Sequence, residues 1–117
     1  MHPPDYSKPP NFGPSTMREE AEIEAELQAK NKNAPRLSPE QIDYEIAKEQ
    51  YYQFPETVMT VCCLTLRNGY NVVGTSAPAS PENFDPDIAR KISRQKARDK
   101  IWELEGYVLK SKLARRT

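Results

Sequence analysis

Three arginines follow one another at four-residue steps in the second half of the chain. Arg90, Arg94 and Arg98 would share one face of a helix, and between residues 90 and 100 six basic residues stand against one acid, Asp99. Guanidinium groups are forked donors that suit phosphates and carboxylates. The row therefore predicts either an anion-binding site or a solvated helix face whose partners are acids of the same chain.

The segment SPENFD lies just ahead of this row and places Phe84 beside the expected start of the helix. An aromatic ring at that position either staples the first turn of the helix or stacks on a flat ligand. Phe84, Arg90, Arg94 and Arg98 together form the candidate ligand-binding set.

Other kinds of chemistry have little support in the sequence. The single histidine is His2, so a His-dependent nucleophile, base or metal cluster cannot form. The P-loop, GxGxxG and GxSxG motifs are absent. Cys62 and Cys63 are adjacent, which is neither metal nor redox spacing, and we expect both to be reduced and structural. We therefore expect no metal, no cofactor and no enzymatic activity; a hydrolase using only carboxylates is the remaining alternative.

The composition indicates one small domain with a polar tail. The 117 residues carry no net charge, 29% are charged and 11 are prolines. Zero net charge disfavours a protein that coats nucleic acid. Residues 1–56 hold 11 acids and 6 bases, and residues 57–117 hold 6 acids and 11 bases. This asymmetry favours contacts between subunits or a local anion site, with two solvated faces as the alternative. No apolar run is long enough to span a membrane, which predicts a soluble, intracellular protein.

Residues 1–36 are expected to form an arm with a marginal acidic helix. Five prolines in residues 1–14 predict a flexible or polyproline-like segment. Residues 16–31 follow with a capping box of Thr16 and Glu19, but their apolar stripe is thin. We expect this helix to pack weakly.

Residues 37–117 are expected to form a single α+β domain that begins with a second helix. Ser38 is its N-cap, Pro39 occupies the first turn, and Gln41 completes a capping box. The pattern predicts a helix from residue 38 to residue 54, ended by Pro55.

An antiparallel two-stranded hairpin follows. Residues 57–66 and 70–75 are rich in β-branched residues, and Asn68-Gly69 between them predicts a type I′ turn. Apolar residues lie on both faces of this ribbon. We expect one face to take helices of the same chain and the other, or an open edge, to take another subunit, which makes the protein a homo-oligomer.

A long C-terminal helix closes the domain. Asp85-Pro86-Asp87 is a strong helix start, and Gly106 marks a place where the helix bends or ends. Trp102 and Tyr107 are expected to be core anchors. The core-facing stripe is predicted to contain Ile88, Ala89, Ile92, Ala97, Ile101 and Leu104.

The strings CLTLRNGYNVVG, SPENFD and WELEGYVL, in this order, resemble a known family. It is the family of small tailed-phage proteins typified by gene product forty-nine of coliphage N-four and gene sixty-six of phage Sf-six. The resemblance runs from Ser38 to Leu113. The chain departs from the family pattern at Ala89, where a glycine is favoured, and at Ser93, where an alanine is favoured.

The resemblance implies a phage accessory protein that acts early in infection, in the host bacterial cytoplasm, on host enzymes or defences. Some phage proteins of similar size are oligomeric sponges for nucleotide immune signals. The expected function is therefore non-enzymatic sequestration of a phosphorylated nucleotide. The alternative is a protein that caps a host enzyme or defence protein through the arm and the helix at residues 16–31. A DNA-binding regulator is a weaker alternative, since net charge is zero and a helix-turn-helix is not recognisable.

Overall fold

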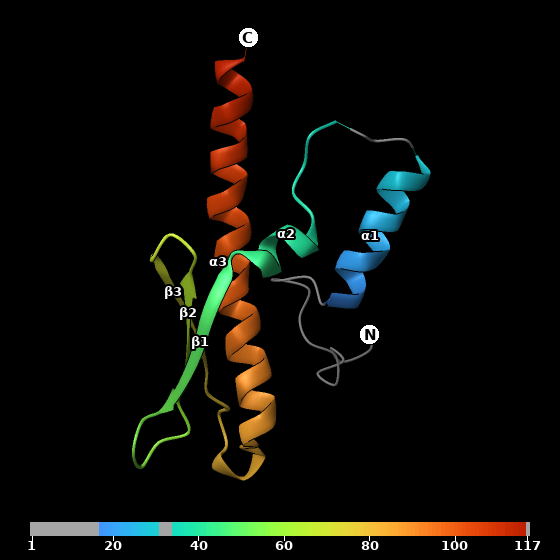
Figure 1. Cartoon of the computed structure of the whole chain (residues 1–117). Coiled ribbons are helices and arrows are strands. Elements are labelled where there is room, and N and C mark those ends of the chain that lie inside the picture. The colour runs from blue at the N-terminus through green and yellow to red at the C-terminus, as the bar shows by residue number, and fades with distance from the viewer. Residues whose placement is uncertain (1–16, 31–33, 117) are drawn as a thin grey trace.

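The computed structural model describes residues 17–30 and 34–116 and has two layers (Figure 1). One layer is a three-stranded antiparallel sheet in the order β1-β2-β3, and the other is the long helix α3. Helix α2 lies beside α3 and also contacts β1, and α1 lies next to α2 (Figure 1). The α+β class is confirmed, whereas the proline-rich arm lies outside the described residues.

Strands β2 (Thr60–Leu66) and β3 (Asn71–Ser76) form the predicted hairpin. Burial alternates along both strands, so that Cys62, Leu64 and Val72 point toward α3 and are buried. The other face of the sheet is open, with Val73 42% exposed. Its coverage by another subunit stays a prediction.

The loop of this hairpin is longer than the predicted type I′ turn. A type I′ turn requires a positive φ at both of its central residues. Gly69 has a φ of 90°, whereas the φ of Asn68 is not positive. The Gly69 N–H donates to the Leu66 carbonyl at 2.9 Å, and the Leu66 N–H donates to the Tyr70 carbonyl at 2.8 Å. Arg67 thus joins the loop, which becomes a three-residue connection with glycine in the left-handed position.

Helix α2 (Pro39–Tyr44) is short and begins as predicted. The Ser38 side chain accepts from the Gln41 N–H at 3.3 Å, and the Gln41 side chain accepts from the Ser38 N–H at 3.0 Å, so the capping box is confirmed.

The predicted continuation of this helix to residue 54 is wrong, because the sheet has a third strand, β1 (Ile46–Gln53). Strand β1 is antiparallel to β2, with Tyr51 opposite Cys62. A two-stranded ribbon is only marginally stable in water. Residues 46–53 pair with the edge of β2 that would otherwise be open, and their aromatic side chains favour a strand. Tertiary pairing therefore overrides the local helix preference.

Helix α3 (Pro86–Arg115) has 30 residues and starts at a strong N-cap. The Asp85 carboxylate accepts from the N–H groups of Asp87 at 2.9 Å and Ile88 at 3.1 Å. The helix continues through Gly106 to Arg115, so it does not end at this glycine.

Gly74 of β3 sets the distance between α3 and the sheet. A Cβ atom at this position would lie closer than 3.0 Å to backbone atoms of Ser93, Lys96 and Ala97. Such a close approach is possible only if the helix presents small side chains to the strand. Ala89, Ser93 and Ala97 do so, and all three are buried.

This close approach explains why the predicted core stripe of α3 is only partly right. Ala89, Ala97 and Ile101 are buried as expected. The larger residues Ile88, Ile92 and Leu104 are instead 54%, 41% and 38% exposed, because the small-residue face has turned toward the sheet. Trp102 packs against the core, as predicted. Tyr107 is 76% exposed, so its assignment as a core anchor is wrong.

Helix α1 (Met17–Ala29) confirms the acidic helix. Among its described side chains, Glu20 alone is buried. A second contact to the rest of the chain is the ion pair of Glu24 with Arg36, at 2.6 Å. The helix is therefore held by charged groups.

Candidate functional site

Two of the four candidate ligand-binding residues line one small cavity. Phe84 and Arg90 line this cavity together with residues of strand β1, close to the N-terminus of α3. The cavity has a volume of about 80 Å³. Its other lining residues are Tyr51, Tyr52, Gln53, Thr60 and Pro86.

The connection before α3 places Phe84 in this cavity. A 3-10 turn (η1, Pro81–Asn83) ends at Phe84, whose N–H donates to the Pro81 carbonyl at 3.1 Å. Asp85 then caps α3, so Phe84 is fixed between two defined backbone turns. The ring is half-buried.

Arg90 is the most available of the three arginines. Its side chain is 58% exposed and lies 3.8 Å from the Asp87 carboxylate, a long ion pair. The guanidinium carbon is 6.0 Å from the centre of the Tyr51 ring, at the outer limit of a cation–π contact. Arg90 thus offers donors at a surface that is aromatic.

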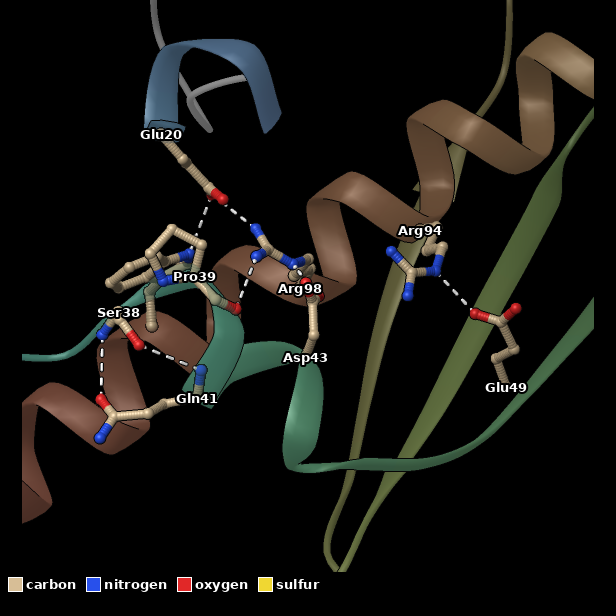
Figure 2. A network of polar contacts seen from close by, with 9 residues as sticks. Glu20, Ser38, Pro39, Gln41, Asp43, Glu49, Arg94 and Arg98 are labelled. Atoms are coloured by element: carbon tan, nitrogen blue, oxygen red, sulfur yellow. Dashed lines mark hydrogen bonds and ion pairs between the residues drawn. The ribbon is translucent and has the colours of Figure 1, made fainter. Parts of the chain in front are cut away.

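Arg94 binds an acid of the same chain, and Figure 2 shows this pair apart from Arg98 and its partners. Its Nε donates to the Glu49 carboxylate of β1 at 2.6 Å. Both side chains are about one third to one half exposed. A ligand at Arg94 would therefore have to share this guanidinium with Glu49.

Arg98 lies in the interior and has no exposed surface (Figure 2). It donates to Glu20 of α1 at 2.5 Å, to Asp43 of α2 at 2.8 Å and to the Pro39 carbonyl at 3.3 Å. The three arginines therefore do not form one open surface, although their four-residue spacing on α3 is as predicted. The Arg98 guanidinium joins α3 to helices α1 and α2 and is not exposed to a ligand.

The cluster of Glu20, Asp43, Arg98 and Trp102 is referred to below as the charged knot. The Trp102 indole also donates to Glu20, at 3.1 Å. The second Glu20 oxygen, Oε2, is buried without a hydrogen-bond partner among the described residues. Nearby, burial raises the pKa of Asp99 to about 6, and the negative charge of Glu20 adds to this effect. The knot thus contains two carboxylates and one guanidinium, and one carboxylate oxygen is left without a hydrogen bond among the described residues.

Cys62 and Cys63 are both free, as predicted. Burial raises the pKa of the Cys62 thiol, which lies next to Tyr51. The pKa of Tyr51 is raised to about 12, chiefly by burial and also by Cys62 and Glu49. Both groups are therefore protonated at neutral pH, which fits a structural role.

A family model identifies the chain. Residues 37–113 match the model described as the Phage protein (N4 Gp49/phage Sf6 gene 66) family. The chain belongs to this family. The match spans Phe84, Arg90 and the whole sheet and excludes α1. No curated protein and no solved structure matches the chain.

Ala89 and Ser93 are small residues at a place where the structure requires them. Both residues lie on the α3 face that packs against Gly74 of β3. Glycine or alanine at either position would preserve the close contact.

Sequence reasoning missed the contribution of β1 to the cavity. The predicted helix from residue 38 to residue 54 contains Tyr51, Tyr52 and Gln53, whereas in the strand these three residues line the cavity with Phe84. The adjacent aromatic residues of KEQYYQF were a signal for a strand.

Two classes of site receive no support from the described part of the chain. Groups of three or more His, Cys, Asp or Glu residues able to hold a metal ion do not occur among these residues. Within the same residues, no helix is both long and apolar enough to cross a membrane.

Proposed function

We propose that this phage protein is a non-enzymatic accessory protein that binds a small phosphorylated ligand carrying a flat ring, such as a nucleotide signal. It would act in the cytoplasm of the infected bacterium. The supporting observation is the meeting of Phe84, Tyr51 and Tyr52 with the exposed guanidinium of Arg90 around one cavity. Aromatic rings stack on bases, and arginine binds phosphates.

The size of the cavity restricts how such a ligand would bind. Ligand pockets usually have about 300–1,000 Å³, whereas this one has about 80 Å³. It can receive one ring or one phosphate group. The remainder of a nucleotide would lie outside it, along α3 toward Arg94.

A release assay tests this function. The purified protein is incubated with a nucleotide extract of bacterial cells, washed and denatured, and the supernatant is analysed by mass spectrometry. We expect an intact, phosphorylated small molecule. Recovery of a chemically altered molecule would contradict binding without turnover, and an empty supernatant would contradict nucleotide capture.

Variants then locate the site. A charge-assisted contact is worth about 1.5–3 kcal/mol, so Arg90→Ala should weaken binding by roughly 10- to 100-fold in a calorimetric titration. Lys91→Ala is the matched control, since Lys91 is an exposed neighbouring base that does not line the cavity. Phe84→Leu keeps an apolar side chain and removes the stacking ring. If it lowers the melting temperature but leaves affinity unchanged, Phe84 only staples the helix.

The second candidate function is capping of a host protein, and α1 is the observation that favours it. This helix leaves Glu22 and Glu26 exposed, and among its described side chains Glu20 is the buried one. These exposed carboxylates are available to a basic partner, although each also pairs with a base of the same helix, Arg18 or Lys30. In the release assay this function predicts no small molecule, and a Glu22→Lys/Glu26→Lys variant would lose the host protein.

A further inference from the structure

The two outer strands of the sheet differ in how their free edges are protected. The strand order is β1-β2-β3, so β1 and β3 each have one unpaired edge among the described residues. Strand β1 contains Lys48 and Glu49 and has an irregular register between Ile46 and Lys48, and such features discourage further pairing. Strand β3 has the sequence NVVGTS, without a charge, a proline or a register shift. Its edge is therefore open to another strand.

The backbone groups at this edge follow from the pairing of β2 with β3. The Leu66 N–H donates to the Tyr70 carbonyl at 2.8 Å, which makes these two residues a hydrogen-bonded pair. Bonded pairs alternate with non-bonded pairs along an antiparallel ladder, so every second residue of β3 after Tyr70 bonds to β2. The N–H and C=O groups that point away from β2 belong to Asn71, Val73 and Thr75.

Helix α3 offers an apolar surface below this edge. Arg94 forms its ion pair with β1, so that side of α3 faces β1. Ser93 lies under Gly74 of β3, and Ile92 is about 100° further round the helix, on the side opposite to Arg94. Because β1 and β3 flank β2, Ile92 lies toward the free edge of β3. Ile92 is 41% exposed and Ile88, one turn earlier, is 54% exposed, so a fourth strand beside β3 would cover both.

Two basic residues continue this face of α3. Ile92, Lys96 and Lys100 follow one another at four-residue steps. The backbone of Lys96 lies directly under β3, since a Cβ at Gly74 would be 2.9 Å from its carbonyl carbon. Lys96 and Lys100 are exposed, and neither forms an ion pair with another described residue. The next acid on this side is Glu103, so an added strand with carboxylates would first meet unpaired ammonium groups.

The direction of an added strand follows from that of β3. The last residue of β3, Ser76, pairs with Thr60, and Thr60 lines the small cavity together with Pro86, the first residue of α3. Strand β3 therefore runs antiparallel to α3. A fourth strand antiparallel to β3, which is the more stable pairing, runs parallel to α3 and passes Ile88 first and Lys100 last.

We propose that the free edge of β3 binds an extended segment of another protein as a fourth strand. The side chains of this segment that point toward α3 are apolar in its first half, where they cover Ile88 and Ile92. They are acidic in its second half, where they pair with Lys96 and Lys100. Main-chain hydrogen bonds to β3 supply affinity, and these side chains supply selectivity.

A second copy of the chain fits this edge poorly. The β3 side chains that point toward α3 are those of Val72 and Ser76, with Gly74 between them. They are small and include no carboxylate that could pair with Lys96. The edge shares no residue with the cavity at Phe84, so its test is independent of the ligand-binding function.

Amide hydrogen exchange of the full chain, measured residue by residue by NMR, tests this site. The probe is the end-blocked peptide VTVTETE at millimolar concentration, and VTVTKTK is its control. In the free protein we expect fast exchange at Val73 and Thr75 and slow exchange at Gly74, which bonds to β2. The peptide VTVTETE should slow exchange at Val73 and Thr75 at least about tenfold and leave Gly74 unchanged. The peptide VTVTKTK should have no effect.

Two variants test the backbone and the charges separately. Thr75→Pro removes one outward N–H and no bond to β2, and it should abolish the protection of Val73 by VTVTETE. Lys96→Glu combined with Lys100→Glu should reverse the preference, so that VTVTKTK protects the edge. Lys91→Glu is the matched control, because Lys91 is an exposed base on a different face of α3, and it should still prefer VTVTETE.

Three results would overturn the proposal. The first is unchanged exchange at Val73 and Thr75 in the presence of VTVTETE, and the second is equal protection by both peptides. The third is protection of these amides in the free protein that rises with protein concentration, because a second copy would then hold the edge. Circular dichroism of each variant confirms that the fold is retained.

Discussion

Helix α3 contacts the sheet on one side and α1 on another, and the two contacts use different kinds of side chain. Against β3, small residues let two backbones approach closely at Gly74, and the surrounding side chains are apolar. Against α1, the contact consists of Glu20 bound to Arg98 and Trp102. Close apolar packing tolerates no added volume, whereas a buried ion pair tolerates no change of charge.

The two contacts should therefore fail in different ways. Apolar packing around Gly74 joins α3, β2 and β3 into one cooperative unit, so its loss should unfold the domain. The charged knot joins α1 to that unit through a few directional bonds, so its loss should release one helix locally.

The largest effect is expected for Gly74→Val. Its Cβ would overlap with backbone atoms of α3, which cannot move aside as a flexible side chain could. We expect a loss of about 3–5 kcal/mol in the free energy of unfolding, measured by urea denaturation. Gly106→Ala is the control, since a Cβ at Gly106 meets no atom within 4 Å. In the middle of a helix this change should stabilise the protein by about 0.5–1 kcal/mol. Equal behaviour of the two variants would show that Gly74 does not set the helix–sheet distance.

An intermediate effect is expected for Glu20→Ala. Arg98 keeps Asp43 and the Pro39 carbonyl, so the interior retains a paired charge, but α1 loses its buried anchor. Hydrogen exchange over residues 18–29 should accelerate, by roughly the 1.5–3 kcal/mol of a charged hydrogen bond. Exchange in β2 should hardly change. Glu22→Ala is the control, since Glu22 is exposed and pairs with Arg18 of the same helix. Slow exchange of α1 in the Glu20 variant would mean that other contacts hold this helix.

The smallest effect concerns pH and sharpens the description of the charged knot. Asp99 has a pKa of about 6 in the folded protein, above its usual value of 3.8, because of burial, Glu20 and Glu103, with Arg98 opposing. The folded state therefore binds this proton more tightly than the unfolded state does. Asp99 favours folding below about pH 4, and this contribution is lost as pH rises to about 6.

Asp99→Asn isolates this contribution. Relative to the wild type, the variant should gain stability between pH 4 and pH 6 and keep that gain up to pH 8. The measurement is a series of thermal melts of both proteins at matched ionic strength. A difference between them that does not vary with pH would show that Asp99 ionises normally in the folded protein.

Local signals in the sequence determined the ends and turns of several elements. The Ser38 capping box, the Asp85 N-cap and the Asn68-Gly69 loop depend on bonds between residues at most four apart. Such bonds form wherever the local backbone permits, so their residues could be recognised without knowledge of the fold. The family was recognisable in part for a related reason, since two of its three short motifs, CLTLRNGYNVVG and SPENFD, contain the Asn68-Gly69 loop and the Asp85 N-cap.

Only the tertiary structure decided that residues 46–53 form a strand and which arginines of the row stay exposed. Strand β1 exists because β2 has an open edge for it, a condition that the segment's own residues do not reveal. Arg98 is buried because α1 brings Glu20, 78 residues earlier, and α2 brings Asp43, 55 residues earlier, to its guanidinium. Arg90 has the same spacing and residue type but meets no such acids, and it stays open. Helical periodicity places residues on a face, and the elements that pack there decide whether that face binds a ligand or the chain itself.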